Sequence, residues 1–231
     1  MNRTILITGS RKGIGRYLSE YYLNNKYNII GCSRSESDLN HQNYLHVTGD
    51  VSNESDVKNI VRKGYKKFGS IDILINNAGK ASLNHSLLTP KKTVSEVFET
   101  NVHGTFLFSR ECAKVMIRNK FGRIINFSTV AVPMNLEGEL IYASSKSSVE
   151  TMSKIFSKEL SSYNITVNTI GPTPVETDLI KVVPKEKVDK ILSDQTIKRF
   201  GKFSDISNVI NFFIKDESSF ITGQKIYLGG L

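Results

Sequence analysis

The chain lacks the features that would assign it to a membrane or to a metal-binding class. No apolar run reaches the ~18 residues that a membrane-spanning helix needs, and Met1-Asn2-Arg3 leads directly into a short apolar segment instead of a signal peptide. The two cysteines, Cys32 and Cys112, and the four histidines show no metal-ligand spacing. We therefore expect a cytoplasmic protein with buried free thiols, no membrane contact and no bound metal.

Linkers, internal repeats and low-complexity tracts are also absent, so the 231 residues fit one domain with a sizeable core. Short apolar runs alternate with amphipathic stretches, a pattern typical of repeated strand–helix units with right-handed crossovers. These runs cover residues 4–8, 27–32, 71–75, 123–127 and 165–170. The pattern predicts an α/β protein with a mostly parallel sheet.

Acidic residues are fewer than basic ones, at 22 Asp and Glu against 31 Lys and Arg, which gives a formal net charge of +9. A basic balance is one sign of nucleic-acid binding, but here the positive residues are scattered and no basic patch is interleaved with aromatic residues. We therefore expect no nucleic-acid partner.

The first apolar run leads into a glycine-rich segment that is typical of dinucleotide binding. Thr4–Thr8 is followed by Gly9-Ser10-Arg11-Lys12-Gly13-Ile14-Gly15 and then by a helical pattern through Leu18 and Leu23. Glycine permits a tight turn close to a ligand, and the amides at the start of the next helix can bind a pyrophosphate. A tight turn without a ligand is the alternative, but the position after a first buried strand favours a dinucleotide.

Tyr142 and Lys146 are spaced as a proton-transfer pair. In a helix, positions i and i+4 share a face, so the Lys146 ammonium would lie near the Tyr142 phenol. A nearby cation lowers the pKa of a tyrosine from its usual ~10 and makes the hydroxyl a usable acid or base. The same spacing occurs by chance in many helices, so this interpretation depends on the other motifs.

Together these motifs resemble the short-chain dehydrogenase/reductase family, and the resemblance runs from Ile5 to Gly230. It implies a single NAD(P)-binding domain over residues 1–231, built as a Rossmann-type, doubly wound parallel sheet with helices on both faces. It also implies hydride transfer between a nicotinamide cofactor and a carbonyl or alcohol substrate. The other matching blocks are Asp50-Val51, Asn76-Asn77-Ala78-Gly79, Glu99–Gly104, Asn168–Thr177 and Phe220–Gln224.

The resemblance implies cofactor contacts along these blocks. The glycine loop would hold the pyrophosphate, Asp50-Val51 would sit at the adenine, and Asn168–Thr177 would meet the nicotinamide. Carried over position by position, the implied cofactor-binding residues are Gly9, Ser10, Arg11, Gly13, Ile14, Gly15, Ser33, Arg34, Asp50, Val51, Asn77, Ala78, Gly79, Tyr142, Lys146, Pro172, Val175 and Thr177.

The residues after the second apolar run favour NADPH (NADP+) over NADH. An NAD enzyme usually places a carboxylate there, which binds the ribose 2′-hydroxyl and repels a 2′-phosphate. Here the run ends in Ser33-Arg34, and Arg34 can bind a phosphate through a charge-assisted fork. Arg11 adds a cation on the same side, with Lys12 as a weaker candidate. The alternative is that these loop cations are only solvated.

The resemblance also implies catalytic roles. Tyr142 would donate the proton, Lys146 would lower the Tyr142 pKa and hold the nicotinamide ribose, and Asn101 would link a proton relay to solvent. Counting back from Tyr142 places Thr129 where the family has the serine that binds the substrate carbonyl. The threonine hydroxyl can still donate to that oxygen, whereas its methyl group narrows χ1 freedom. Ser128 is the second choice, since adjacent residues at a strand end point to opposite faces.

Two segments depart from the family pattern. The stretch from Ser33 to Gly49 is short, so we expect its crossover helix to be cut down or lost. Gly171-Pro172-Thr173-Pro174 replaces the family's Pro-Gly beside the nicotinamide and should stiffen the turn, because proline fixes φ. Val175 and Thr177 remain the expected contacts to the carboxamide.

Residues 179–199 resemble a mobile substrate lid with an apolar inner face, which suits an acyl chain but is also compatible with simple packing. The apolar positions are Ile180, Val182, Val183, Val188, Ile191 and Leu192. The nearest pattern match is to 3-oxoacyl-carrier-protein reductases, and the positive charge would favour an acidic carrier protein. Lys120 occupies one basic docking position of those reductases, and the uncharged Tyr163 occupies another.

Two alternatives stay open. A sugar, polyol or other small carbonyl compound would fit the same chemistry. A catalytically weak NADPH-binding regulator would keep the glycine loop, but the presence of Asn101, Tyr142 and Lys146 argues against it.

The resemblance finally implies a homodimer or homotetramer. Residues 105–117 and 147–160 match helices that pair across a two-fold axis in the family, and residues 225–228 match a strand that often builds a second interface.

Overall fold

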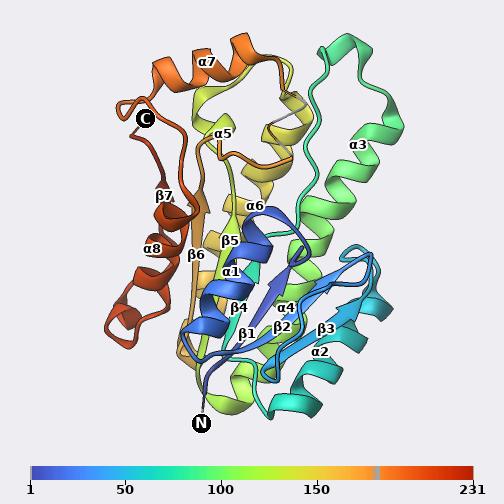
Figure 1. The fold of residues 1–231 in the computed structure, drawn as a ribbon, viewed down its shortest axis with the longest axis vertical. Coiled ribbons are helices and arrows are strands. Elements are labelled where there is room, and N and C mark those ends of the chain that lie inside the picture. The colour runs from blue at the N-terminus through green and yellow to red at the C-terminus, as the bar shows by residue number, and fades with distance from the viewer. Residues whose placement is uncertain (1, 179, 181–182, 231) are drawn as a thin grey trace.

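The computed structural model describes residues 2–178, 180 and 183–230, and within them the chain forms a seven-stranded parallel sheet (Figure 1). The strand order is β3-β2-β1-β4-β5-β6-β7, with every neighbouring pair parallel. The strands are β1 (Thr4–Thr8), β2 (Asn28–Ser33), β3 (Tyr44–Thr48), β4 (Ile73–Asn76), β5 (Gly122–Phe127), β6 (Ile165–Gly171) and β7 (Lys225–Tyr227). The order reverses between β1 and β4, and ligands of such sheets bind beyond the carboxyl ends of the strands at that point.

Helices cover both faces of the sheet, as the sequence predicted (Figure 1). The longer helices are α1 (Gly13–Asn24), α2 (Glu54–Phe68), α3 (Lys91–Phe98), α4 (Gly104–Asn119), α6 (Leu140–Glu159), α7 (Lys185–Asp194) and α8 (Phe203–Ile214). The short ones are η1 (Ser86–Leu88), η2 (Glu99–His103), α5 (Ala131–Met134), η3 (Ser161–Tyr163) and η5 (Asp216–Phe220).

Side-chain alternation along the strands builds two separate cores. In β1, Ile5 and Ile7 face the core shared with α1 and α8, while Leu6 faces the core shared with α2 and α4. Successive residues of a strand point to opposite faces, so an apolar run without polar interruptions is what a strand covered on both sides requires. The Rossmann-type, doubly wound architecture follows from this pattern.

The predicted loss of the crossover helix between β2 and β3 is confirmed, because residues 34–43 form no helix. Side chains hold this connection instead. The Tyr44 ring lies across Gly31, where an added Cβ would come within 2.3 Å of the tyrosine oxygen. The Tyr44 hydroxyl lies 3.3 Å from Ser10 Oγ and 3.1 Å from His46 Nδ1. This polar network connects β3 to the glycine loop, and His46 Nε2 lies 3.0 Å from the carbonyl oxygen of Ser35 in the connection.

The site described below lies at the carboxyl edge of the sheet, where Figure 1 shows α7 beyond the strand ends. No helix among the described residues is both long and apolar enough to cross a membrane.

Candidate active site

The turn between β1 and α1 forms a cradle for an anion. Gly9 and Gly13 have φ angles of 69° and 57°, which favour glycine. A Cβ on Gly15 would lie 2.2 Å from the Gly9 carbonyl oxygen, so only glycine allows this close packing. No side chain caps the start of α1, which leaves the amides of its first turn available to a phosphate. These features fit the pyrophosphate of a dinucleotide.

Asn77 and Ala78 lock this cradle to the neighbouring strand. The Asn77 side chain donates to the carbonyl oxygens of Thr8 and Gly9, at 2.9 and 3.3 Å. The Ala78 amide donates to Thr8 Oγ1 at 2.9 Å. The predicted cofactor residues from β1 and β4 are therefore brought together, with the Asn77 side chain holding the loop in shape.

The Ser10 side chain faces the protein interior. Its side chain is fully buried and its hydroxyl lies 3.4 Å from the Cys32 carbonyl oxygen, while its amide donates to the same oxygen at 3.1 Å. Both polar groups are thus engaged in holding the loop on β2. Ser10 therefore has a structural role in the loop, and its contact with a cofactor stays a prediction.

The predicted cations of the cofactor site, Arg11 and Arg34, are exposed near the carboxyl ends of β1 and β2. Several effects act on the pKa of the half-buried Asp50 carboxyl. Burial alone would raise this pKa, but the hydrogen bonds from Ser52 and the charge of Arg34 together outweigh burial, so the pKa lies below its ordinary value. The Ser33 hydroxyl donates to the Ser35 carbonyl oxygen at 2.6 Å. Arg34 is thus close enough to Asp50 to act on it electrostatically, beside the expected ribose position.

Sequence reasoning missed one carboxylate in this region. Asp38 forms an ion pair with Arg16 on α1, which lowers the pKa of the Asp38 carboxyl, and Arg11 contributes a smaller effect. The prediction considered only the residue at the end of β2, whereas Asp38 comes from the loop that replaces the crossover helix. The weaker candidate, Lys12, lies 3.4 Å from Asp178.

Asn101 lies in a π-helical turn, η2, between α3 and α4, and is fully buried. Its Oδ1 accepts from the Lys80 amide at 2.7 Å, and its Nδ2 donates to the Lys80 carbonyl oxygen and to Ser145 Oγ, both at 2.9 Å. A Cβ on Gly79 would lie 3.5 Å from Asn101 Oδ1 and 3.5 Å from Lys146 Nζ. Asn101 and Lys146 therefore border the same small space.

Lys146 is buried, and its ammonium donates to the Phe127 carbonyl oxygen at 2.8 Å. Burial lowers the pKa of Lys146 to about 8. Tyr142, one turn earlier on α6, is half-buried, and burial raises the pKa of its phenol to about 12; the charge of Glu139 adds to the rise and the Thr129 hydroxyl opposes it.

The direction of the Tyr142 pKa shift is opposite to the predicted one. The predicted lowering rests on the Lys146 charge, but the Lys146 ammonium donates to the Phe127 carbonyl oxygen, and the loss of water around the phenol is the dominant effect on its pKa. Tyr142 therefore holds its proton throughout the neutral range, as a proton donor must.

Thr129 and Ser128 point to different surroundings. The Thr129 hydroxyl accepts from the Ala131 amide at 3.2 Å and interacts with the Tyr142 phenol. Ser128 is buried, and its hydroxyl donates to Glu150 Oε1 at 2.5 Å. The geometry thus favours Thr129 over Ser128 beside the phenol.

Comparison with known proteins identifies the family. The model of the short chain dehydrogenases matches residues 3–188. The chain belongs to the short chain dehydrogenase family. Among curated relatives, the 3-oxoacyl-[acyl-carrier-protein] reductase FabG of Vibrio cholerae is 30% identical over 99% of this chain and 96% of its own length. FabG of Escherichia coli K12 is 29% identical over 97% of this chain and 95% of its own.

Solved structures agree with the short chain dehydrogenase assignment. ElxO with NADP bound superposes with a TM-score of 0.90 at 27% identity, over 99% of this chain and 97% of its own. A tyrosine-to-phenylalanine variant of ElxO with NADPH bound gives the same TM-score and identity. The protein is therefore an oxidoreductase of a family that uses a nicotinamide cofactor.

The short chain dehydrogenase site is completed by the segment after β6. Thr177 lies beside the glycine loop, 3.6 Å from a Cβ placed on Gly13. The Pro172 carbonyl oxygen accepts from the Val130 amide at 3.2 Å, and Val175 forms an isolated bridge to Gly201. The prediction left out Thr173, whose Oγ1 is buried with no hydrogen-bond partner among the described residues.

The predicted lid includes α7, where Val188 and Ile191 are buried. Lys187 Nζ donates to the Glu137 carbonyl oxygen at 3.3 Å and so connects α7 to the loop before α6. Ile180, Val183 and Leu192 are half-buried. Leu179 and Val182 of the predicted lid lie outside the described residues.

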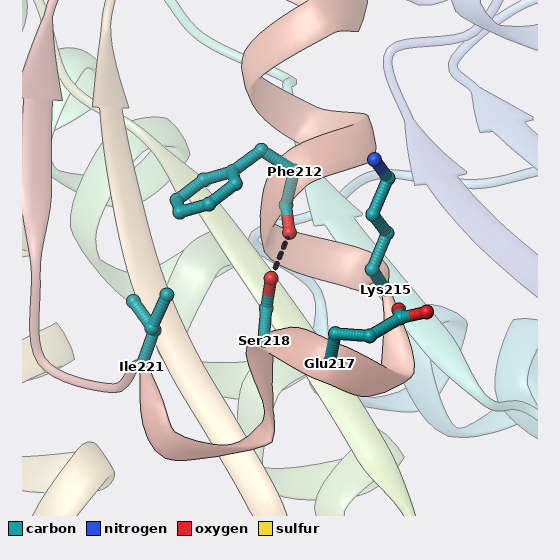
Figure 2. A pocket seen from close by; sticks show the side chains of 5 residues that line it. All are labelled: Phe212, Lys215, Glu217, Ser218 and Ile221. Atoms are coloured by element: carbon teal, nitrogen blue, oxygen red, sulfur yellow. Dashed lines mark hydrogen bonds between the residues drawn. The ribbon is translucent and has the colours of Figure 1, made fainter.

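One hollow lies apart from this chemistry. Figure 2 shows it between the end of α8 and η5, where the Ser218 hydroxyl donates to the Phe212 carbonyl oxygen. None of the predicted site residues lines it. No cluster of three or more His, Cys, Asp or Glu side chains suited to a metal ion occurs within residues 2–178, 180 and 183–230.

The burial of Lys146 predicts a pH dependence of stability. Its pKa is about 8 in the folded chain and 10.5 ordinarily, so between these values the unfolded chain binds more protons and the stability of the folded state rises with pH. Below this window the charged lysine costs the folded state on the order of 3 kcal/mol. The free energy of unfolding of the wild type minus that of Lys146→Met should therefore increase from about pH 8 to about pH 10.

Urea titrations across this pH range measure that difference. Lys66→Met makes the same change at an exposed position of α2 and should show no such increase. A flat difference for Lys146→Met would show that Lys146 is not buried as a cation.

Proposed function

We propose that this protein is an NADPH-dependent reductase that transfers hydride to a substrate carbonyl, or catalyses the reverse alcohol oxidation, with a 3-oxoacyl thioester as the substrate class. The observation that carries the proposal is the meeting of Tyr142, Thr129, Lys146 and Asn101 at one edge of the sheet, beside an anion cradle at the start of α1. We take residues 1–231 as one functional domain with a lid over residues 179–199.

Each side chain of the site has a separate role in the proposed reduction. When bound, NADPH would supply the hydride. The Tyr142 phenol, protonated at neutral pH because its pKa is about 12, donates the proton to the carbonyl oxygen. The Thr129 hydroxyl donates a hydrogen bond to the same oxygen and stabilises the charge that develops on it.

Lys146 and Asn101 support the proton transfer. With a pKa of about 8, Lys146 is predominantly a cation at neutral pH, and its ammonium, which donates to the Phe127 carbonyl oxygen, holds α6 against the end of β5 beside Tyr142 and would hold the nicotinamide ribose. Asn101 bonds to Ser145, whose hydroxyl donates to the Tyr142 carbonyl oxygen at 2.7 Å. This connection holds the helix that carries both Tyr142 and Lys146 against the Asn101 turn.

Preference for NADPH is supported by the exposed Arg34 and Arg11 beside the expected ribose position, and by the NADP and NADPH bound to the ElxO relatives. A guanidinium binds a phosphate through paired, charge-assisted hydrogen bonds.

An acyl substrate on an acidic carrier is supported by the names of the FabG relatives and by the net charge of +9. Lys120, exposed at the end of α4, is the proposed docking cation. The cytoplasmic location stays a prediction.

Removing the phenolic hydroxyl tests the reductase mechanism. Tyr142→Phe should lower turnover by about 10²- to 10⁴-fold, because the proton donor is lost, while NADPH affinity stays within about twofold. The measurement is NADPH oxidation with an acetoacetyl thioester and a panel of sugars, polyols and small ketones, and NADPH binding by fluorescence. Tyr65→Phe makes the same change at an exposed position of α2 and should leave turnover unchanged. Full activity of Tyr142→Phe would rule out this proton donor, and binding of NADPH without turnover of any substrate would favour a regulator.

Arg34 tests the cofactor preference. Arg34→Ala should weaken NADPH binding by about 10- to 100-fold, the value of one lost charged hydrogen-bonding group, and leave NADH binding unchanged. Isothermal titration with each cofactor measures the effect, and Arg62→Ala, also exposed but on α2, is the matched control. Equal losses for both cofactors would place Arg34 away from the 2′-phosphate.

We also propose that the chain forms a symmetric dimer or tetramer through α4 and α6. Phe106 on α4 and Ile155 on α6 are 39% and 52% exposed, although both are large and apolar. Light scattering should give at least a dimer, and the double change Phe106→Asp with Ile155→Asp should lower the mass to that of one chain. A wild-type monomer would contradict this proposal.

A further inference from the structure

One face of α6 presents three residues at intervals of four, Tyr142, Lys146 and Glu150, and each meets the end of β5. Lys146 bonds to the carbonyl oxygen of Phe127, Glu150 accepts from the Ser128 hydroxyl, and Tyr142 interacts with the Thr129 hydroxyl. The last residue of the strand and the residue after it are thus each bonded to one residue of the helix, and Thr129 follows beside Tyr142. The first two helix residues belong to the proposed reductase site, and Glu150 has no role there.

Glu150 is the centre of a polar cluster with three side-chain partners. Its side chain is only 9% exposed, and its Oε1 accepts at 2.5 Å from both Ser128 Oγ and the Tyr227 hydroxyl. Its Oε2 lies 2.9 Å from the Lys225 ammonium. Hydrogen bonds to an ionised carboxylate are among the stronger ones in proteins, because the acceptor is charged. A single carboxylate therefore connects α6, β5 and β7.

The neighbouring backbone leaves Ser128 little freedom. The Ser128 amide donates to the Ile170 carbonyl oxygen at 2.8 Å, and the Val130 amide donates to that of Pro172 at 3.2 Å. The Tyr227 ring packs against Gly171, where an added Cβ would come within 2.2 Å of it. Ser128 directly precedes Thr129, so the bond of its hydroxyl to Glu150, together with these amide bonds, fixes the backbone from which the Thr129 side chain projects beside Tyr142.

We propose that Glu150 is a positioning residue of the reductase: through the Ser128 hydroxyl it sets the orientation of Thr129, and hence of the substrate carbonyl, relative to Tyr142. This inference rests on the proposed function. In this role the Glu150 carboxylate contacts neither the substrate nor the cofactor. Small displacements of a positioning group reduce rates strongly, since proton and hydride transfer both require close alignment.

A double-mutant cycle tests whether Glu150 acts through Ser128. Glu150→Ala and Ser128→Ala should each lower kcat by about 10-fold, while the KM for NADPH stays within about twofold. The double variant should be no slower than the slower single variant, because both changes break one connection. Unchanged kcat in the single variants, or losses that multiply in the double variant, would overturn the proposal.

Conservative and control variants separate positioning from general stability. Glu150→Gln keeps an acceptor oxygen for Ser128 and should retain more of kcat than Glu150→Ala. Glu159→Ala removes an exposed carboxylate from the end of the same helix and should leave kcat unchanged. Equal losses in Glu150→Gln and Glu150→Ala would show that the hydrogen bond to Ser128 is not what Glu150 contributes.

Amide hydrogen exchange gives a readout that needs no substrate. In Glu150→Ala, the amides of Ser128 and Val130 should exchange faster, while those of β1 and β4 keep the wild-type rate. Faster exchange throughout the sheet, or no change at Ser128, would contradict the proposal. If the wild type reduces no carbonyl compound, the proposed function fails, and the exchange measurement still decides whether Glu150 orders the segment after β5.

Discussion

The contact between one face of α6 and the end of β5 is the interaction on which the site depends. It buries the Lys146 ammonium, whose pKa falls to about 8, and the Tyr142 phenol, whose pKa rises to about 12. Both shifts have burial as their largest cause, and burial of a charge is unfavourable unless surrounding packing outweighs it. The apolar cores on both faces of the sheet supply that packing, so the chemistry of the site follows from the stability of the fold.

A row of hydrogen bonds between neutral side chains connects α6 to the central strands of the sheet. Asn76 on β4 donates to Asn126 Oδ1 on β5 at 2.8 Å, and Asn126 donates to Ser153 Oγ on α6 at 2.8 Å. All three side chains are buried, and each bond in such a chain satisfies a group that would otherwise be unpaired. These hydrogen bonds, together with those of Asn101 to Lys80 and Ser145, fix the position of α6 against the central strands. They do so without placing another charge near Lys146.

The sequence predicted what depends on periodicity and chain order, and missed what depends on burial. Strand runs, the helical pair Tyr142 and Lys146, and the lost crossover helix all follow from local pattern, and the structure confirms them. The inward orientation of Ser10 and the raised pKa of Tyr142 depend on which atoms meet after folding. Spacing along a helix predicts which residues share a face. It does not predict whether the Lys146 ammonium donates to the Tyr142 phenol or to the Phe127 carbonyl oxygen.

Thr129 illustrates how a departure from the family pattern can be compatible with activity. A β-branched side chain has few χ1 rotamers, so less conformational entropy is lost when its hydroxyl is held in one orientation. The Ala131 amide donates to that hydroxyl, and Ser128 on the preceding position is bound to Glu150. A chain that had lost its reaction would have no use for an oriented donor beside a protonated phenol. The ordered surroundings of Thr129 therefore favour an enzyme over an idle cofactor-binding protein, and they suit the proposed role of its hydroxyl as the donor to the substrate carbonyl.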